Sequence, residues 1–284
     1  MTAETAQADR PPGRRIWLCA DDYGMASGVN AAIRELIGMG RLNATSVMTV
    51  AQNLDQGAAD ALGVLNLIRE STAIGLHVTL SAPFRPLTEA FRPLRESAFL
   101  PLGATLAHAM ARRFDADILR AEIAAQFERF RVLFRRPPDF VDGHQHVHLF
   151  PQVRDAVLTE LQRHAPGAWV RQCGRVRVGL SDPKALVLDV LSASFRHRAA
   201  RLGIRTNTAF AGTYVFHDRA DFAAMFPKFL DGLPHGGLVM CHPGHVDAEL
   251  ERLDPVTNLR EREFAYLASD RFLPALADAG VRLH

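Results

Sequence analysis

Short apolar runs alternate with helix-like patterns along the whole chain. The first run, over residues 16–20, is typical of a strand buried on both faces, and it ends directly in Asp21 and Asp22. From Ser27 the apolar positions take helical spacing, and Gly40 is placed to end that helix. These segments predict a first strand–helix unit with polar residues at the strand exit.

The same alternation continues to the end of the chain. The pattern predicts strands at 43–50, 73–80, 140–144, 168–173 and 237–241, and helices at 55–68, 118–134, 151–164 and between 260 and 279. Asp115 or Asp117 is a candidate cap of the helix over 118–134. We therefore expect an α/β fold with a mostly parallel sheet, closed or nearly closed into a TIM-barrel-like (β/α) barrel, and a site at the C-terminal strand ends. An open, doubly wound sheet follows the same rule and is the alternative.

Length and composition favour a single domain. The chain has 284 residues, of which 48% are hydrophobic, and this is ample for a buried core. We expect one catalytic domain over 15–284, preceded by a disordered or loosely attached polar tail over 1–14. The tail lacks the apolar stretch of about 7–15 residues that a secretory signal requires. No window approaches the roughly 18 apolar residues of a membrane-spanning helix.

Charge and cysteine content narrow the class of protein further. The formal net charge is +2 with 23% charged residues, which is too balanced for a dedicated nucleic-acid binder. Cys19, Cys173 and Cys241 are far apart and form no CxxC motif, so neither a disulfide framework nor a zinc knuckle is indicated. We expect a reducing, cytoplasmic setting.

Three polar clusters, each directly after an apolar run, are the main indication of a catalytic or metal-binding site. They are Asp21-Asp22, Gly75-Leu76-His77 and the segment 142–148, Asp-Gly-His-Gln-His-Val-His. Oxygen and imidazole ligands from the ends of different strands suit a divalent cation that keeps one position open, whereas structural sites are usually closed by thiolates. The clusters therefore predict a hydrolytic metal site. In a zinc site the metal lowers the pKa of bound water from ~15.7 toward ~7.

The histidine run after Asp142 raises a question of geometry. Residues two apart in a strand share a face, so His144, His146 and His148 would point the same way in a regular strand. The helix expected from Pro151 predicts instead that the strand ends near His144. The two later histidines would then lie in a loop, where they orient a ligand or line the substrate pocket. For any one of them alone, a hydrogen-bonded structural histidine is the alternative.

Two candidate proton-transfer groups accompany the ligands. Neighbouring Asp21 and Asp22 cannot both face one site in a regular strand, so a turn at the strand exit must bring them together. One carboxylate would then hold the metal and the other act as general base, whereas a helix cap or solvated turn is the alternative. His242, after the apolar run 237–241, is a candidate general acid for a leaving amine, with a turn-capping histidine as the alternative.

Four motifs follow one another along the chain: Ala20-Asp21-Asp22-Tyr23-Gly24, Gly75-Leu76-His77, the segment 142–148 with Pro151, and Cys241-His242-Pro243-Gly244. In this order and spacing they resemble those of the YdjC-like carbohydrate deacetylases, the family of the chitooligosaccharide and hopanoid-biosynthesis deacetylases. The resemblance spans nearly the whole chain, from about Ile16 to the last helices. Tyr23 stands where the family usually has phenylalanine, and the segment 81–87 follows the family pattern only loosely.

The resemblance implies a metal-dependent N-deacetylase that hydrolyses the acetamide of an N-acetylated amino sugar, in an oligosaccharide or glycolipid, to acetate and a free amine. It implies one divalent ion, Mg²⁺ or Zn²⁺, and it allows a homodimer. By motif position the metal ligands would be Asp22, His77 and His144, with Asp21 as base and His242 as acid. Arg171 would hold Asp21 or contact the substrate, and the remaining candidates for substrate contact or support of the ligands are Asp142, His146 and His148.

Other interpretations of the chain stay open at this point. Asp-x-His-x-His motifs also occur in amidohydrolases and phosphoesterases, although there the motif normally lies on the first strand. A non-catalytic carbohydrate-binding barrel is a third interpretation, but every proposed ligand is present and aromatics are only 8%. The segment 185–205 is Leu-rich and then basic, which favours a packed helix with a solvated basic face. Peripheral contact with an anionic membrane is its alternative, and would suit a lipid-linked substrate.

Overall fold

The computed structural model describes residues 13–68, 72–176, 183–217, 219–255 and 257–284, with the side chains of 183–185 excepted. Most of the tail expected over 1–14 therefore lies outside the described residues. Arg14, at its end, already belongs to the first strand, and its guanidinium donates to the carbonyl oxygens of Leu233 and Ala279 at 2.5 and 2.6 Å.

Eight strands of the described chain pair in parallel to form one curled sheet. The strands are β1 (Arg14–Tyr23), β2 (Ala44–Val47), β3 (Ala73–Val78), β4 (Phe140–Gly143), β5 (Trp169–Val170), β6 (Phe210–Ala211), β7 (Leu238–Cys241) and β8 (Val281–Leu283). Their order is β5-β4-β3-β2-β1-β7-β6, and β8 pairs with the first residues of β1. Isolated bridges from Val170 to Thr206 and from Arg175 to Phe210 join the two edges. The predicted, nearly closed parallel barrel is thereby confirmed.

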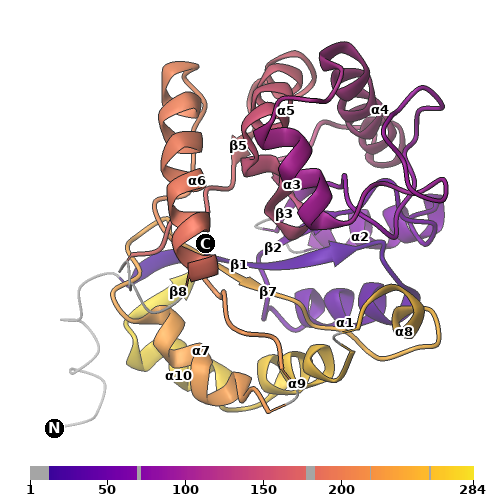
Figure 1. Cartoon of the computed structure of the whole chain (residues 1–284). Helices are drawn as coiled ribbons and strands as arrows, with labels where there is room; N and C mark the ends of the chain where they lie inside the picture. The colour runs from indigo at the N-terminus through magenta and orange to yellow at the C-terminus, as the bar shows by residue number, and fades with distance from the viewer. Residues whose placement is uncertain (1–12, 69–71, 177–182, 218, 256) are drawn as a thin grey trace, which may run out of the picture.

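Helices surround this sheet in the arrangement that strand–helix units produce. Figure 1 shows α3, α4 and α5 together on one side of the sheet and α7, α9 and α10 on the opposite side. The helices are α1 (Ser27–Gly38), α2 (Gln56–Ile68), α3 (Leu102–Met110), α4 (Ala116–Phe134), the 3₁₀ helix η2 (His144–Leu149), α5 (Pro151–His164), α6 (Pro183–Arg201), α7 (Phe222–Leu230), α8 (Leu250–Leu253), α9 (Thr257–Ala268) and α10 (Phe272–Asp278).

Burial explains why the apolar runs became central strands. Every residue of β2, β3, β4 and β7 is buried, as expected for strands covered on both faces. Of the two candidate caps, Asp115 begins α4, because its carboxylate accepts the backbone N–H of Asp117 and of Ile118 at 3.0 Å.

The strand predicted over 168–173 is shorter than its apolar pattern indicated. After β5, side chains accept the hydrogen bonds that the backbone N–H groups would otherwise donate to a neighbouring strand. The N–H of Gln172 donates to the Asn207 side chain, and that of Cys173 to the Ser192 hydroxyl, each at 2.8 Å. These bonds end the sheet ladder. The strands β6 and β8 are two and three residues long and were not predicted, because such short segments show no periodicity.

The segment expected as a basic helix forms α6. On this helix Ser192, Phe195 and Ala199 are buried, whereas Val187 and Val190 are exposed. One face therefore packs against the rest of the protein, in line with the favoured interpretation, and membrane contact stays a prediction. None of the helices in the described ranges has the length and apolar character needed to cross a membrane.

Candidate metal centre

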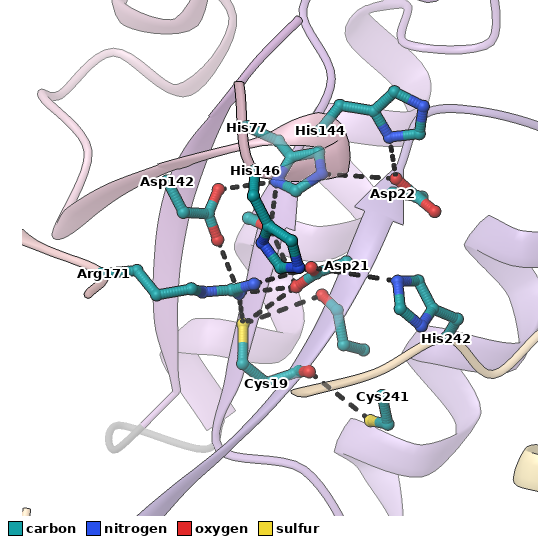
Figure 2. Close-up of polar contacts among 12 residues, drawn as sticks. Cys19, Asp21, Asp22, His77, Asp142, His144, His146, Arg171, Cys241 and His242 are labelled. Atoms are coloured by element: carbon teal, nitrogen blue, oxygen red, sulfur yellow. Dashed lines mark hydrogen bonds and ion pairs between the residues drawn. The ribbon is translucent and has the colours of Figure 1, made fainter. Parts of the chain in front are cut away.

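An irregular end to β1 brings its two aspartates to one site. Asp22 has φ of +71°, in the left-handed region that side chains rarely adopt, and the pairing register with β2 shifts between Ala20 and Tyr23. This breaks the alternation that would otherwise point Asp21 and Asp22 to opposite sides. Figure 2 shows both carboxylates in the same cluster of polar side chains. Strained backbone of this kind concentrates at functional sites.

Asp22, His77 and His144 come together from three different segments. Asp22 Oδ1 lies 2.9 Å from His144 Nδ1 and 3.3 Å from His77 Nε2. The three candidate ligand atoms all lie within 4.8 Å of one another, and the three side chains are almost completely buried. One carboxylate oxygen and two imidazole nitrogens that converge in this way form a donor set that fits a divalent cation.

Asp142 fixes the orientation of the His77 ring. His77 Nδ1 lies 2.6 Å from Asp142 Oδ1 and 2.9 Å from the Ser46 hydroxyl, and this leaves Nε2 to face Asp22. A carboxylate on the far nitrogen is the usual support of a histidine metal ligand. Burial opposes protonation, but the Asp142 and Asp22 carboxylates raise the pKa of His77 to about 10. A cation would therefore bind in competition with a proton.

A tight turn presents His144 to the site. η2 begins at His144 as predicted for the strand end, and the next two residues, Gln145 and His146, have φ of +51° and +61°. The His144 ring packs edge-on against Phe84, with ring centroids 5.6 Å apart. The left-handed turn, rather than a regular strand, thus separates the directions of the successive histidines.

Arg171 holds the Asp21 carboxylate through two hydrogen bonds. Its Nη1 and Nη2 donate to the two Asp21 oxygens at 2.6 and 2.5 Å, and Nη2 also lies 2.5 Å from Asp142 Oδ2. The side chain is fully buried, and its contact with Asp21 corresponds to one of the two roles expected for it. Burial acts to raise the pKa of Asp21, but the Arg171 guanidinium overrides it and holds this pKa far below its usual range. Asp21 is therefore an ionised carboxylate beside the ligand group.

A second cluster of metal-binding residue types has a different explanation. Cys19, Asp21 and Asp142 also lie within ligand distance of one another. The Arg171 Nη2 atom lies 3.0 Å from Cys19 Sγ and 2.5 Å from both carboxylates, so a guanidinium is already the counter-ion of this cluster. We assign it to support of Asp21 and not to a metal.

His242 lies on the other side of Asp21. Its Nε2 is 4.0 Å from Asp21 Oδ2, and its side chain is 19% exposed. The backbone N–H of His242 donates to Glu263 at 2.5 Å, and the Tyr214 hydroxyl donates to the second oxygen of the same carboxylate at 2.5 Å. The ring thus combines contact with the polar cluster and access to solvent, which a proton donor to substrate needs.

The remaining two histidines differ in position. His146 is half-buried, with Nδ1 3.5 Å from Cys173 Sγ and its ring edge-on to Phe210. Burial and the nearby Arg171 lower the pKa of His146 to about 3, so the imidazole is neutral. His148 is buried behind the site, where its Nε2 donates to the Arg171 carbonyl oxygen at 2.9 Å. His148 therefore supports the backbone of the residue that holds Asp21.

Helix α9 contributes two residues that the sequence pattern did not single out. Arg260 Nη2 donates to Asp22 Oδ2 at 2.7 Å and to Asp254 at 2.6 Å, and Glu263 holds the backbone at His242. Both are buried. The signal was a charged pair inside an otherwise apolar stripe of the helix, whose buried members are Leu259, Arg260, Glu263, Tyr266 and Leu267.

The polar cluster lies at the C-terminal ends of the strands, as predicted. A surface hollow of about 780 Å³ lies at the opposite end, near the beginning of β1 and the end of α10, and holds none of the candidate residues. Its lining includes Arg14, Tyr266 and Asp278. Ligand chemistry in α/β barrels is built at the C-terminal face, so the hollow does not compete with the metal centre.

Comparisons with known proteins find relatives that match nearly the whole chain. A chitooligosaccharide deacetylase of Escherichia fergusonii is 28% identical over 274 residues, which cover 95% of this chain and 97% of that protein. One from Yersinia pestis (strain Pestoides F) is also 28% identical, over 277 residues that cover 93% and 94%.

Two solved structures have the same fold. A protein of Enterococcus faecalis V583, described as a candidate for cellobiose-phosphate cleavage, superposes with a TM-score of 0.71 at 19% identity, over 96% of this chain and 97% of that one. A lactam utilization protein of Thermus thermophilus gives a TM-score of 0.54 at 15% identity, over 95% and 99%. The sequence model of the family described as YdjC-like protein matches residues 15–278. The chain therefore belongs to the YdjC-like family.

Proposed function

We propose that this protein is a divalent-metal-dependent N-deacetylase that converts an N-acetylated amino sugar into acetate and the free amine. The convergence of Asp22 Oδ1, His77 Nε2 and His144 Nδ1 beside the ionised Asp21 carboxylate carries this proposal. The two relatives named chitooligosaccharide deacetylases support the substrate class. Amide hydrolysis needs a nucleophilic water, a stabilised oxyanion and a protonated leaving amine, and the cluster has groups for these tasks.

Asp22, His77 and His144 would hold the cation. Two imidazole donors with one carboxylate favour Zn²⁺ over Mg²⁺, because magnesium prefers an octahedron of oxygen ligands. When bound, such a cation lowers the pKa of water and polarises the acetamide carbonyl.

Asp21 is proposed as the general base. Arg171 and the neighbouring imidazoles keep its carboxylate ionised, so it can accept the proton of an attacking water. The two Arg171 hydrogen bonds fix the orientation of the carboxylate while the proton moves.

His242 is proposed as the general acid that gives a proton to the leaving amine. Glu263 fixes the backbone from which the His242 ring projects. The His242 ring is partly exposed, whereas its neighbour Asp21 is buried. Base and acid thus lie side by side, 4.0 Å apart, and both would face an acetamide bound at the candidate metal centre.

The proposed function is tested by acetate release. A panel of N-acetylglucosamine, chitooligosaccharides and N-acetylglucosaminyl lipids is incubated with the protein before and after a chelator, and then with Zn²⁺, Mg²⁺ or Mn²⁺ added back. We expect release from at least one sugar class, its loss with chelator and its best recovery with Zn²⁺. No acetate from any substrate by the metal-loaded protein would overturn the deacetylase assignment.

Arg260→Gln is expected to weaken metal binding by about 10- to 100-fold, the usual effect of losing a partner that orients a ligand. Arg260 occupies Asp22 Oδ2, and this leaves Oδ1 to face the two histidines. Without it the carboxylate is free to rotate. Affinity is measured by competition with a fluorescent zinc chelator. Arg262→Gln on the same helix is the matched control, because Arg262 donates to the Ala220 carbonyl instead. Equal affinities for the two variants would contradict the role of Arg260.

Thiol modification of the native protein is expected to leave acetate release unchanged. Cys19, Cys173 and Cys241 are all buried, and burial raises the pKa of each thiol. They are therefore poor nucleophiles that reagents do not reach. Alkylation is followed by mass spectrometry alongside the rate. A thiol that bound metal protects, and whose alkylation abolishes the rate, would contradict this expectation.

A further inference from the structure

Phe216 presents an exposed aromatic ring beside the candidate acid. The residue is 41% exposed, and its ring centroid lies 5.5 Å from that of His242 at an interplanar angle of 82°. The preceding residue, Val215, is 68% exposed. An exposed aromatic ring beside a cluster of polar side chains is a candidate ligand contact, because ligand sites combine apolar walls with a few polar groups.

The segment that carries Phe216 is anchored at two points. Gly212 has φ of +99°, and a Cβ atom there would collide with the Met240 carbonyl oxygen, so the chain leaves β6 pressed against β7. Tyr214 is held by its hydroxyl bond to Glu263, and its ring lies 4.4 Å from the Phe216 ring. The same Glu263 holds the backbone at His242, so one carboxylate ties the aromatic segment to the candidate acid.

We propose that Phe216 is a stacking platform for a pyranose ring of the substrate, an inference that rests on the proposed function. One face of a pyranose carries mainly C–H groups, and a fixed aromatic ring covers such a face at little entropic cost. With the acetamide beside the neighbouring Asp21 and His242 side chains, a sugar ring attached to it would lie next to His242, where the Phe216 ring is exposed. The site would therefore take N-acetylated pyranosides in preference to acyclic acetamides.

Phe216 packs against the sugar and transfers no proton, so its contact is equally strong in the ground state and the transition state. Loss of such a contact raises KM and leaves kcat nearly unchanged. We expect Phe216→Ala to raise KM for the best sugar of the panel by about 10-fold. Phe216→Trp is expected to restore KM, since it keeps an aromatic face.

The experiment measures kcat, KM and bound metal for the zinc-loaded full chain, for both Phe216 variants and for Leu273→Ala. Leu273 is 55% exposed on α10 and serves as a surface control. In Phe216→Trp, the added indole should also change its fluorescence when sugar is added to protein that carries Asp21→Asn and so turns over at least about 10²-fold more slowly.

The outcomes separate the platform from the proposed function. Acetate release by the unchanged chain, together with the rise in KM and its rescue by tryptophan, supports both. If the unchanged chain releases acetate but Phe216→Ala has the same KM, the platform is overturned while the deacetylase stands. A fall in kcat at constant KM in Phe216→Ala has the same meaning. No release by the unchanged chain from any sugar overturns the deacetylase and the platform with it.

Discussion

Asp21→Asn is expected to lower kcat by at least about 10²-fold while the protein keeps its metal. The amide is close in size to the carboxylate, but it cannot accept a proton from water. Arg171 keeps its contact with Asp142 in this variant, so its buried charge retains a partner and the fold should persist. The rate of acetate release, the metal content by elemental analysis and the thermal midpoint are measured on the same preparation.

The neighbouring residue provides the matched control. Asp22→Asn alters a proposed ligand one position along the chain, and it should lose metal and activity together. The pair of variants therefore separates proton transfer from metal binding. Near-normal turnover by Asp21→Asn would end its role as base, and loss of metal from that variant would make Asp21 a ligand instead.

His144→Ala is expected to lose metal and activity together. It removes one of three converging donor atoms, and the remaining pair, Asp22 and His77, cannot complete a site. The loss of affinity should exceed the roughly 10- to 100-fold that removal of a mere supporting partner causes. Zinc competition and acetate release measure the two effects, and the thermal midpoint confirms folding.

His146→Ala serves as the comparison for that variant, since His146 lies two residues along the same turn but outside the group of donor atoms. It should keep its full metal content, whatever it does to substrate binding. Full metal content in His144→Ala would instead remove His144 from the ligand set and leave the proposed site incomplete.

The fold was largely predictable because parallel strands carry strong local signals. Runs such as 16–20 and 237–241 are apolar, since both faces of a central strand are covered, and most of their residues became buried strand positions. β6 and β8 were not predictable, because segments of two or three residues hold no periodicity. The early end of β5 could not be predicted from the local pattern either, since it depends on side chains such as Asn207 that lie far along the chain.

The candidate site was predictable where its residues lie at the C-terminal ends of strands. Parallel strands bring their C-terminal ends to one edge, so Asp21, Asp22, His77 and the segment from Asp142 were expected to meet there, and they do. Arg260 was missed although it lies in an otherwise apolar stripe of α9, because a charged residue on a helix is usually solvated. Its contact with Asp22 joins residues 238 positions apart.

The sequence by itself therefore determined the class of fold, the edge of the sheet where chemistry occurs and the residue types available for it, because burial and strand exits are local properties of the chain. The family motifs implied roles for these residues, and the tertiary structure alone decided which side chains hold them in place. Only closure of the barrel placed Arg171 on Asp21, Asp142 on His77 and Arg260 on Asp22. Such pairings depend on distances between remote segments, and no local pattern encodes them.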